Sequence, residues 1–231
     1  MSGNLLILHS PLASLMCFPD ARDTAQFSIF HFPFSILHSK TMDIKIPQTV
    51  GPVMEAITHR WSPRSFSARS ITESDIETIL EAATWAFSAS NEQPWRYIYA
   101  HRGTPLFAQL EGLLMPGNQI WAKNAAVLMV SMMQTTNAAG KPNNWAMHDL
   151  GAANFALMLQ ANALGIYGHV MGGFDQPRTV AELELPEGLT PVAMIALGYR
   201  DVAEKLPEPF LTRELAPRTR KAVSEIVLKK S

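Results

Sequence analysis

Three residues able to bind an anion stand at alternating positions near the start of the chain: Arg60, Ser62 and Arg64. In an extended segment alternate residues face the same side, so two guanidinium groups and a hydroxyl would converge on one ligand. The planar guanidinium fork matches the oxygens of a phosphate group, which makes this segment a candidate phosphate site. The competing interpretation is a solvated helix end with two unrelated arginines.

A second polar cluster lies in the loop from Ser88 to Pro94, which carries hydroxyls and the side-chain amides of Asn91 and Gln93. Amide groups offer both donors and acceptors, so they can bind the edge of a planar heterocycle. Pro94 is expected to restrict Gln93 to an extended backbone. An ordinary turn rich in Ser and Asn is the alternative. Trp95 is expected in the core.

The tail contains a third candidate, the pair Arg218 and Arg220, again two positions apart. This spacing directs two cations to one place, unless the tail is simply a solvated charged arm. Together with Arg60 and Arg64, four arginines are available for a single planar ligand that bears a phosphate. Structural roles alone explain this combination poorly.

Several common catalytic signatures are absent. The sequence has no glycine-rich dinucleotide or P-loop motif, no G-x-S-x-G elbow, and no Cys or His pair at metal-ligand spacing. Seven histidines are scattered along the chain. His148 stands beside Asp149, but adjacent helical side chains diverge by about 100°, so we expect a structural role rather than a catalytic pair. No catalytic side chain and no metal ligand is assigned.

The composition is typical of a packed globular protein, with 47% hydrophobic and 17% charged residues in a chain of 231. The low charged fraction suggests that a partner covers part of the surface. A net charge of -1 argues against nucleic-acid binding. Cys17 is the single cysteine, which excludes an intrachain disulfide and favours a reducing, cytoplasmic compartment. No apolar run is long enough to predict a membrane span.

The first residues differ from the rest of the chain. Residues 1–41 contain apolar stretches without a preceding Lys or Arg, which argues against a secretory signal. Met42 then opens the segment MDIKIP, which is typical of a natural protein start. We expect residues 1–41 to be an extension outside the fold and residues 42–231 to form the folded domain.

From residue 42 onward the pattern alternates between helix and strand. Helices are predicted over Pro52–His59, Thr72–Phe87, Thr104–Leu114 and Asp149–Leu164, with a further short helix starting near Asp175. Strands are predicted over residues 95–100, 125–133, 167–171 and 191–199. The order indicates one α+β domain whose strands are separated by helices.

Three of these segments have distinctive sequences. The helix from Asp149 to Leu164 is apolar on nearly every side, which is typical of a buried helix. Either Thr72 or Ser74 can cap the helix that follows them. The tail from residue 201 onward is too polar at its start to predict core packing, so we expect it to wrap a surface.

From about Pro52 to the C-terminus, the order and spacing of the sequence motifs resemble those of the flavin-dependent nitroreductase family. The motifs are R-x-S-x-R at Arg60, Ser62 and Arg64; S-x-x-N-x-Q-P-W at Ser88 to Trp95; Asn118; the helix DLGAANFALMLQANALG; the turn MGGFD; the strand ALGY; and the basic tail pair. The agreement in order and spacing makes the resemblance specific. Trp61 is bulky where many relatives carry Arg or His. Gly172 stands where some members carry an acidic residue, which places the chain outside that subgroup.

The resemblance implies a central mixed β-sheet flanked by helices, and a homodimer that holds FMN at the subunit interface. One subunit would bind the phosphate side of the cofactor with Arg60, Trp61, Ser62, Arg64, Arg218 and Arg220. The other subunit would contribute Ser88, Ala89, Asn91 and Gln93. Asn118 would face the pyrimidine side of the flavin, and Gly172 and Gly173 would line its central ring with backbone donors.

The resemblance also implies an FMN-dependent oxidoreductase that works by a ping-pong reaction. NADH or NADPH would reduce FMN and leave, and a nitroaromatic, a quinone or a similar conjugated electrophile would take the electrons. The flavin would supply the chemistry, so no side-chain acid or base is required. Two alternatives remain open: a deiodinase- or flavin-fragmenting-type enzyme on the same fold, and a non-catalytic flavin-binding dimer. Neither nucleic acid nor membrane is an expected partner.

Overall fold

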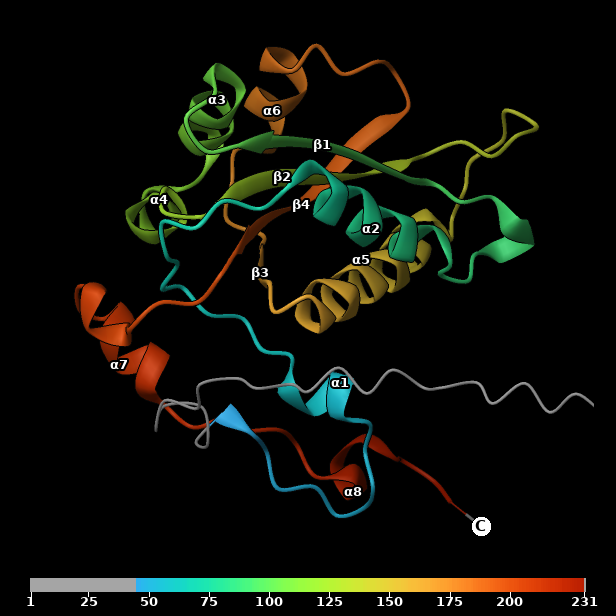
Figure 1. Ribbon diagram of the computed structural model, residues 1–231. Helices are drawn as coiled ribbons and strands as arrows, with labels where there is room; N and C mark the ends of the chain where they lie inside the picture. Colours follow the sequence, from blue (N-terminus) through green and yellow to red (C-terminus); the bar gives the residue numbers. More distant parts are fainter. Residues whose placement is uncertain (1–44, 231) are drawn as a thin grey trace, which may run out of the picture. The chain divides into compact units, whose positions relative to one another are not determined.

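The computed structural model describes residues 45–230, so the prediction for residues 1–41 concerns a part of the chain outside this description. One sheet has the strand order β1-β2-β4-β3 (Figure 1), with β1 at Trp95–His101, β2 at Val127–Gln134, β3 at Tyr167–Met171 and β4 at Leu189–Gly198. Helices flank this sheet, which confirms the α+β class.

The pairing of the strands differs from the mixed sheet that the resemblance implies. All three pairs of neighbouring strands among the described residues are antiparallel. The chain path explains the difference. β2 and β3 run in the same direction and are joined by a helical crossover, but β4 lies between them and is antiparallel to both. The two parallel strands are therefore not hydrogen-bonded to each other.

Helices α2 (Glu73–Thr84) and α5 (Ala146–Ala163) lie side by side over one face of the sheet (Figure 1). Their inward residues share one apolar core with the sheet: Ile76, Ile79, Ala83, Leu150, Ala153, Leu157 and Ala161. These positions recur at helical spacing. The outer face of α5 is different, because Phe155 is 47% exposed and Met147 is 58% exposed. Within its own chain, α5 is thus buried on one face and not on every side.

The opposite face of the sheet is covered by α3 (Pro105–Leu113), α4 (Pro116–Ala122) and α6 (Gln176–Glu182). The sequence analysis did not include α4, which is only seven residues long. The prediction that the start of the tail stays out of the core was wrong. Leu206 and Phe210 are buried in the core of this face, and Ala203 is buried as well, because these apolar residues are spaced among polar ones that stay outside.

The remaining helices are short: α1 (Glu55–His59), η2 (Ala89–Asn91), η3 (Ala203–Lys205), α7 (Phe210–Leu215) and α8 (Val223–Ile226). Of the two candidate caps of α2, the structure selects Thr72, whose side chain accepts a hydrogen bond from the backbone of Asp75 at 3.1 Å. No helix among residues 45–230 combines the length and the apolar character that crossing a membrane requires.

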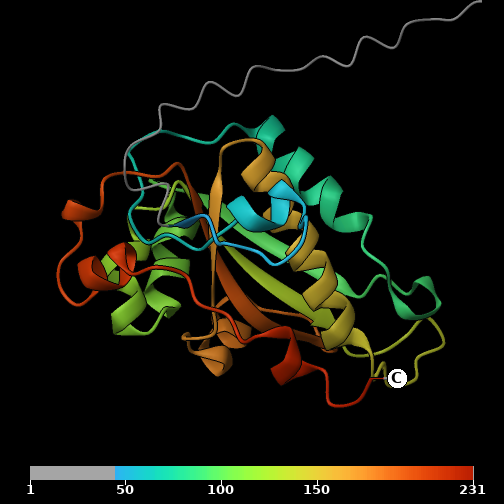
Figure 2. The same cartoon turned by 90° about the horizontal axis from the view of Figure 1, so that it is seen from below.

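The start of the described chain contacts the C-terminal tail, on the side of the domain that Figure 2 shows from below. Lys45 donates through Nζ to the carbonyl of Ala216. In return, Arg218 donates through Nη1 to the carbonyl of Lys45 at 2.9 Å and to that of Thr58. These contacts bring the tail to the end of α1, where the segment that begins at Arg60 follows.

Candidate functional site

Arg60, Arg218 and Arg220 lie within electrostatic range of one another, although the first is far from the others in sequence. Burial lowers the pKa of the Arg60 guanidinium, and the neighbouring charge of Arg220 lowers it further. The pKa of Arg218 is lowered by burial and then by Arg60 and Arg220. No carboxylate pairs with any of these three guanidinium groups within residues 45–230. Their mutual repulsion would be relieved by a bound anion.

Ser62 belongs to this cluster, since its hydroxyl oxygen lies 3.4 Å from Nη1 of Arg60. Arg64 has different neighbours. Its guanidinium lies over the ring of Trp121, 5.7 Å from the ring centre, and its charge faces Glu214 and Arg213. The sequence pattern placed Arg60, Ser62 and Arg64 around one anion. The structure brings Arg60 and Ser62 together, whereas the half-buried Arg64 packs against Trp121.

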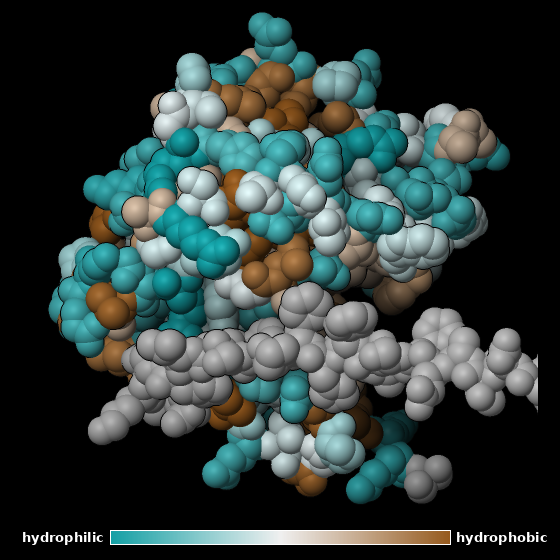
Figure 3. All heavy atoms as spheres, viewed as in Figure 1, coloured by the Kyte–Doolittle hydropathy of each residue, from teal (hydrophilic) through white to brown (hydrophobic). Residues whose placement is uncertain are grey.

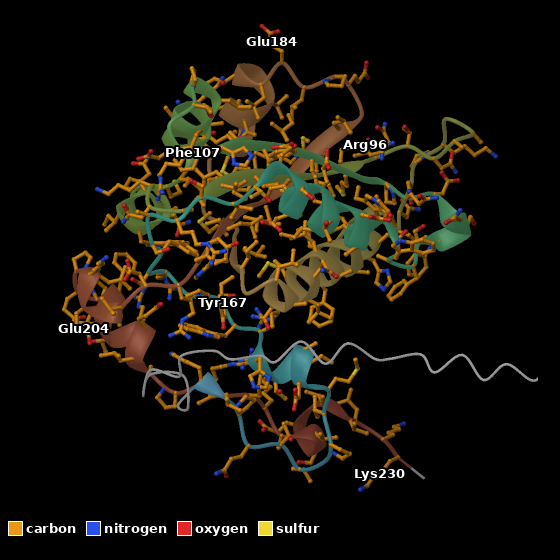
Figure 4. All side chains as sticks on the ribbon, viewed as in Figure 1. Arg96, Phe107, Tyr167, Glu184, Glu204 and Lys230 are labelled. Carbon is orange, nitrogen blue, oxygen red and sulfur yellow. The ribbon has the colours of Figure 1, made fainter. Side chains whose placement is uncertain are left out.

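Trp61 is buried beside the cationic cluster. Its ring meets that of Tyr167 edge to face, with the centroids 6.4 Å apart (Figure 4 labels Tyr167). Lys45 lies over the Trp61 ring at 4.7 Å and Arg200 at 5.1 Å. Cations over an aromatic face are attracted by its quadrupole, so Trp61 helps to hold positive charge in this region. That role was not foreseen, since nothing in the sequence near Lys45 or Arg200 indicated a site.

His169 on β3 contacts the segment that contains Arg60 and Ser62 through Pro63. Its Nδ1 lies 3.1 Å from the carbonyl oxygen of Pro63, and its ring lies 4.6 Å from that of Trp121. A carbonyl oxygen can only accept, so Nδ1 carries the proton. Burial, with a further contribution from the charge of Arg64, lowers the pKa of His169 to about 4. At neutral pH the imidazole is therefore uncharged and serves as a fixed donor.

This shift predicts a pH-dependent stability. Between pH 6.5 and pH 4 the unfolded chain takes up a proton at His169 that the folded chain does not. The uncharged His169 therefore makes its full contribution to the free energy of unfolding above pH 6.5, and this contribution is lost as the pH falls toward 4. Between pH 7.5 and pH 5 the free energy of unfolding of the wild-type protein should fall, and that of His169→Gln should fall by about 1–2 kcal/mol less. Urea denaturation at both pH values measures it; equal losses in the two proteins would contradict the prediction.

Asn118 and the glycine turn after β3 come together as one unit. Asn118 donates through Nδ2 to the carbonyl of Gly173 at 3.0 Å, and the backbone of Met115 donates to the same oxygen. A Cβ at Gly173 would lie 2.8 Å from Nδ2 of Asn118, so a side chain there would displace the Asn118 amide. A Cβ at Gly172 would meet nothing within 4 Å, so the backbone there is open to an approaching ligand.

The loop from Ser88 to Gln93 has an unusual backbone. Ser90, Asn91 and Gln93 have φ values of 53°, 56° and 48°, in the left-handed region. The expectation that Pro94 keeps Gln93 extended was therefore wrong. The Ser88 hydroxyl accepts a hydrogen bond from the Gln93 backbone at 3.1 Å, which holds the loop in this tight form. The loop also borders a surface hollow of about 160 Å³, lined by Ala89, Ser90, Glu92, Asn137, Pro142, Asn143, Asn144 and Trp145.

Asp149 anchors this loop to the first turn of α5. One oxygen of its buried carboxylate accepts from the backbone of Ala89 at 3.0 Å, and the other lies 3.0 Å from Nδ1 of His148. The two side chains contact each other although adjacent helical positions diverge, and the expected structural role of His148 stays a prediction. The imidazole reaches across the angle between adjacent helical positions and also packs against Phe87 and Trp145.

Two groups of predicted site residues, the loop at Ser88 and the segment at Arg60, thus lie at opposite ends of α5, apart from the unit of Asn118 and Gly173. The loop contacts Asp149 in the first turn of the helix. The segment after α1 contacts Tyr167 and His169, just beyond the last turn. Asp149 and Ala163 are separated by roughly 21 Å of helix, at 1.5 Å per residue. A single chain therefore presents two half-sites, and we infer that it does not close both around one small ligand.

The chain is similar to known proteins of one family. The model of the nitroreductase family matches residues 57–104 and 104–199. A protein of Archaeoglobus fulgidus named "Putative NADH dehydrogenase/NAD(P)H nitroreductase" is 29% identical over 150 residues, which cover 63% of this chain and 84% of that protein.

Two solved structures are similar to the described fold. A structure of an oxidoreductase containing FMN is 37% identical, with a TM-score of 0.77 over 81% of this chain and 96% of the other. A nitroreductase family protein from Streptococcus pneumoniae is 22% identical, with a TM-score of 0.62 over 76% of this chain and 98% of the other. The second likeness concerns the fold alone.

Proposed function

The chain belongs to the nitroreductase family, and we propose that it is a homodimeric, FMN-dependent oxidoreductase that takes electrons from NADH or NADPH. One observation carries the proposal: Arg60, Arg218 and Arg220 are gathered from distant segments, and none of the carboxylates that the structure describes pairs with them. Such a cluster is costly to assemble unless a polyanion binds there. The phosphate of FMN has the charge and the oxygens to satisfy it.

The residues present fit the cofactor. The phosphate would be held by Arg60, Ser62, Arg218 and Arg220. The buried Trp61 would pack behind these residues, on the side away from the ligand. Asn118, Gly172 and Gly173 lie farther along the chain, at the other end of β3, where polar backbone and side-chain groups suit the edge of a flavin. The guanidinium of Arg64, which the sequence pattern added to the phosphate ligands, lies over the ring of Trp121 and within range of the charge of Glu214.

The two half-sites support a homodimer. Ser88, Ala89, Asn91 and Gln93 would complete the site of the partner subunit, since α5 keeps them away from Arg60 in their own chain. Apolar side chains also reach the surface among polar ones (Figure 3). Trp85 is 83% exposed and Phe87 is 69% exposed, near the loop that would contact the partner. Exposed apolar side chains of this size favour an interface.

FMN, when bound, supplies hydride and electron transfer between NAD(P)H and the second substrate. The chain's own residues would bind the phosphate, orient the flavin edge and exclude water. His169 is uncharged at neutral pH and holds Pro63, so it is not proposed as an acid or base. We therefore assign no catalytic side chain. The reaction would be ping-pong, and the acceptors would be nitroaromatics, quinones or similar conjugated electrophiles.

An anaerobic titration tests the function. We expect the purified protein to bind FMN, to lose its yellow colour when NADH or NADPH is added under nitrogen, and to regain it when a quinone or nitroaromatic follows. Comparing both nucleotides at equal concentration reveals the preferred donor. A protein that takes up FMN but is not bleached by either nucleotide would be a flavin-binding dimer without this activity. A protein that takes up no FMN would refute the proposal.

A further inference from the structure

Glu214 on α7 lies beneath the phosphate-binding segment and is 96% buried, since its exposed fraction is 4%. Both of its carboxylate oxygens accept from the backbone of Arg64, at 3.1 and 3.0 Å, and one also accepts from the backbone of Ser65 at 3.3 Å. No motif pointed to this residue, because it stands in the polar tail. A buried carboxylate on two consecutive backbone donors fixes the path of the chain at that point.

We propose that Glu214 is a positioning residue of the phosphate site: by holding the backbone of Arg64 and Ser65, it sets the direction in which Arg60 and Ser62 face the ligand. The proposal rests on FMN binding at this segment. On the other side, His169 holds the carbonyl of Pro63, so the segment is clamped immediately after Ser62 from two elements, β3 and α7. The side chains that precede the clamp then need little reorganisation when a phosphate arrives.

The charged groups around Glu214 support the same proposal. Glu214 faces the cations Lys45 and Arg64, and both attract its ionised form, although burial raises its pKa overall. Lys45 is itself buried, and Glu214 is the group that opposes the lowering of its pKa. The carboxylate thus offsets the charges of Lys45 and Arg64. Within residues 45–230, no carboxylate pairs with Arg60, Arg218 or Arg220, and these are the cations that we assign to the phosphate.

Binding of FMN and of riboflavin, which lacks the phosphate, separates positioning from general stability. We expect Glu214→Ala to weaken FMN by about tenfold, the effect of unsatisfied backbone donors and a displaced segment, and riboflavin by less than about twofold. Glu214→Gln should weaken FMN less, because the amide oxygen can still accept from Arg64 and Ser65. Flavin fluorescence gives both dissociation constants, and thermal unfolding of the flavin-free proteins reports their stability.

Glu204→Gln is the matched control, since it removes an exposed carboxylate from η3, close to α7 (Figure 4 labels Glu204), and should leave FMN binding unchanged. If Glu214→Ala does not fold, Glu214→Gln decides. Equal weakening of both flavins would make Glu214 merely structural. Tighter FMN binding by the Glu214 variants than by the wild-type protein would show that the negative charge of Glu214 opposes the phosphate more than its hydrogen bonds help to position the segment. Either result overturns the proposal. A wild-type protein that does not prefer FMN to riboflavin would instead refute the phosphate site itself.

Discussion

We expect Ala153→Glu to prevent folding of the chain. Ala153 lies in the middle of α5 with no exposed surface, packed in the core that α5 shares with α2 and the sheet. A glutamate there would bury an unpaired charge and overfill a packed core. The expected cost is roughly 4 kcal/mol or more, a large part of the 5–15 kcal/mol that stabilises a typical domain. Circular dichroism and solubility measure the loss; a folded variant with the wild-type melting temperature would contradict it.

Phe155→Glu is the matched variant, because it places the same charge two residues away on the exposed face of α5. This substitution removes little that the chain buries itself. We expect the variant to fold, but to be monomeric and to retain little FMN if that face forms the proposed dimer interface. Light scattering measures the mass. A Phe155→Glu protein that remains a dimer with full FMN content would remove this face from the interface.

Arg60→Ala is expected to weaken FMN binding by about 1.5–3 kcal/mol, or roughly 10- to 150-fold, the scale of a charged hydrogen bond. Arg60 has no carboxylate partner among the described residues, so its loss leaves no buried acid behind. The variant should therefore keep the fold and lose affinity. Riboflavin binding should change little, since the lost contact belongs to the phosphate.

Arg178→Ala serves as the control for Arg60, because Arg178 lies on α6 and pairs with Glu182 at 2.7 Å. Removing it takes away one positive charge without touching the cluster. Its FMN affinity should match that of the wild-type protein. Arg218→Ala should act in the same direction as Arg60→Ala. Unchanged FMN affinity in the Arg60 variant would exclude Arg60 from the site.

Much of the local structure could be predicted because it depends on neighbours in the sequence. The helical spacing of Ile76 and Ile79 and the capping hydroxyl of Thr72 determine α2. The continuous apolar run of β2 predicts a strand buried on both faces, as the structure has it. The short helix α4 was not predicted, and its Trp121 packs against His169 and Arg64, both distant in sequence.

By itself the sequence determined the longer helices, the four strands of the described sheet, the family and the set of residues that could bind a phosphate, since all of these follow from residue types and spacing. Only the tertiary structure decided which of them meet. It gathered Arg60 with Arg218 and Arg220, assigned Arg64 to Trp121 and Glu214, and placed the loop at Ala89 at the far end of α5. Spacing along a chain fixes the face of one element, whereas the neighbours of a side chain depend on how elements pack, and no local pattern records that.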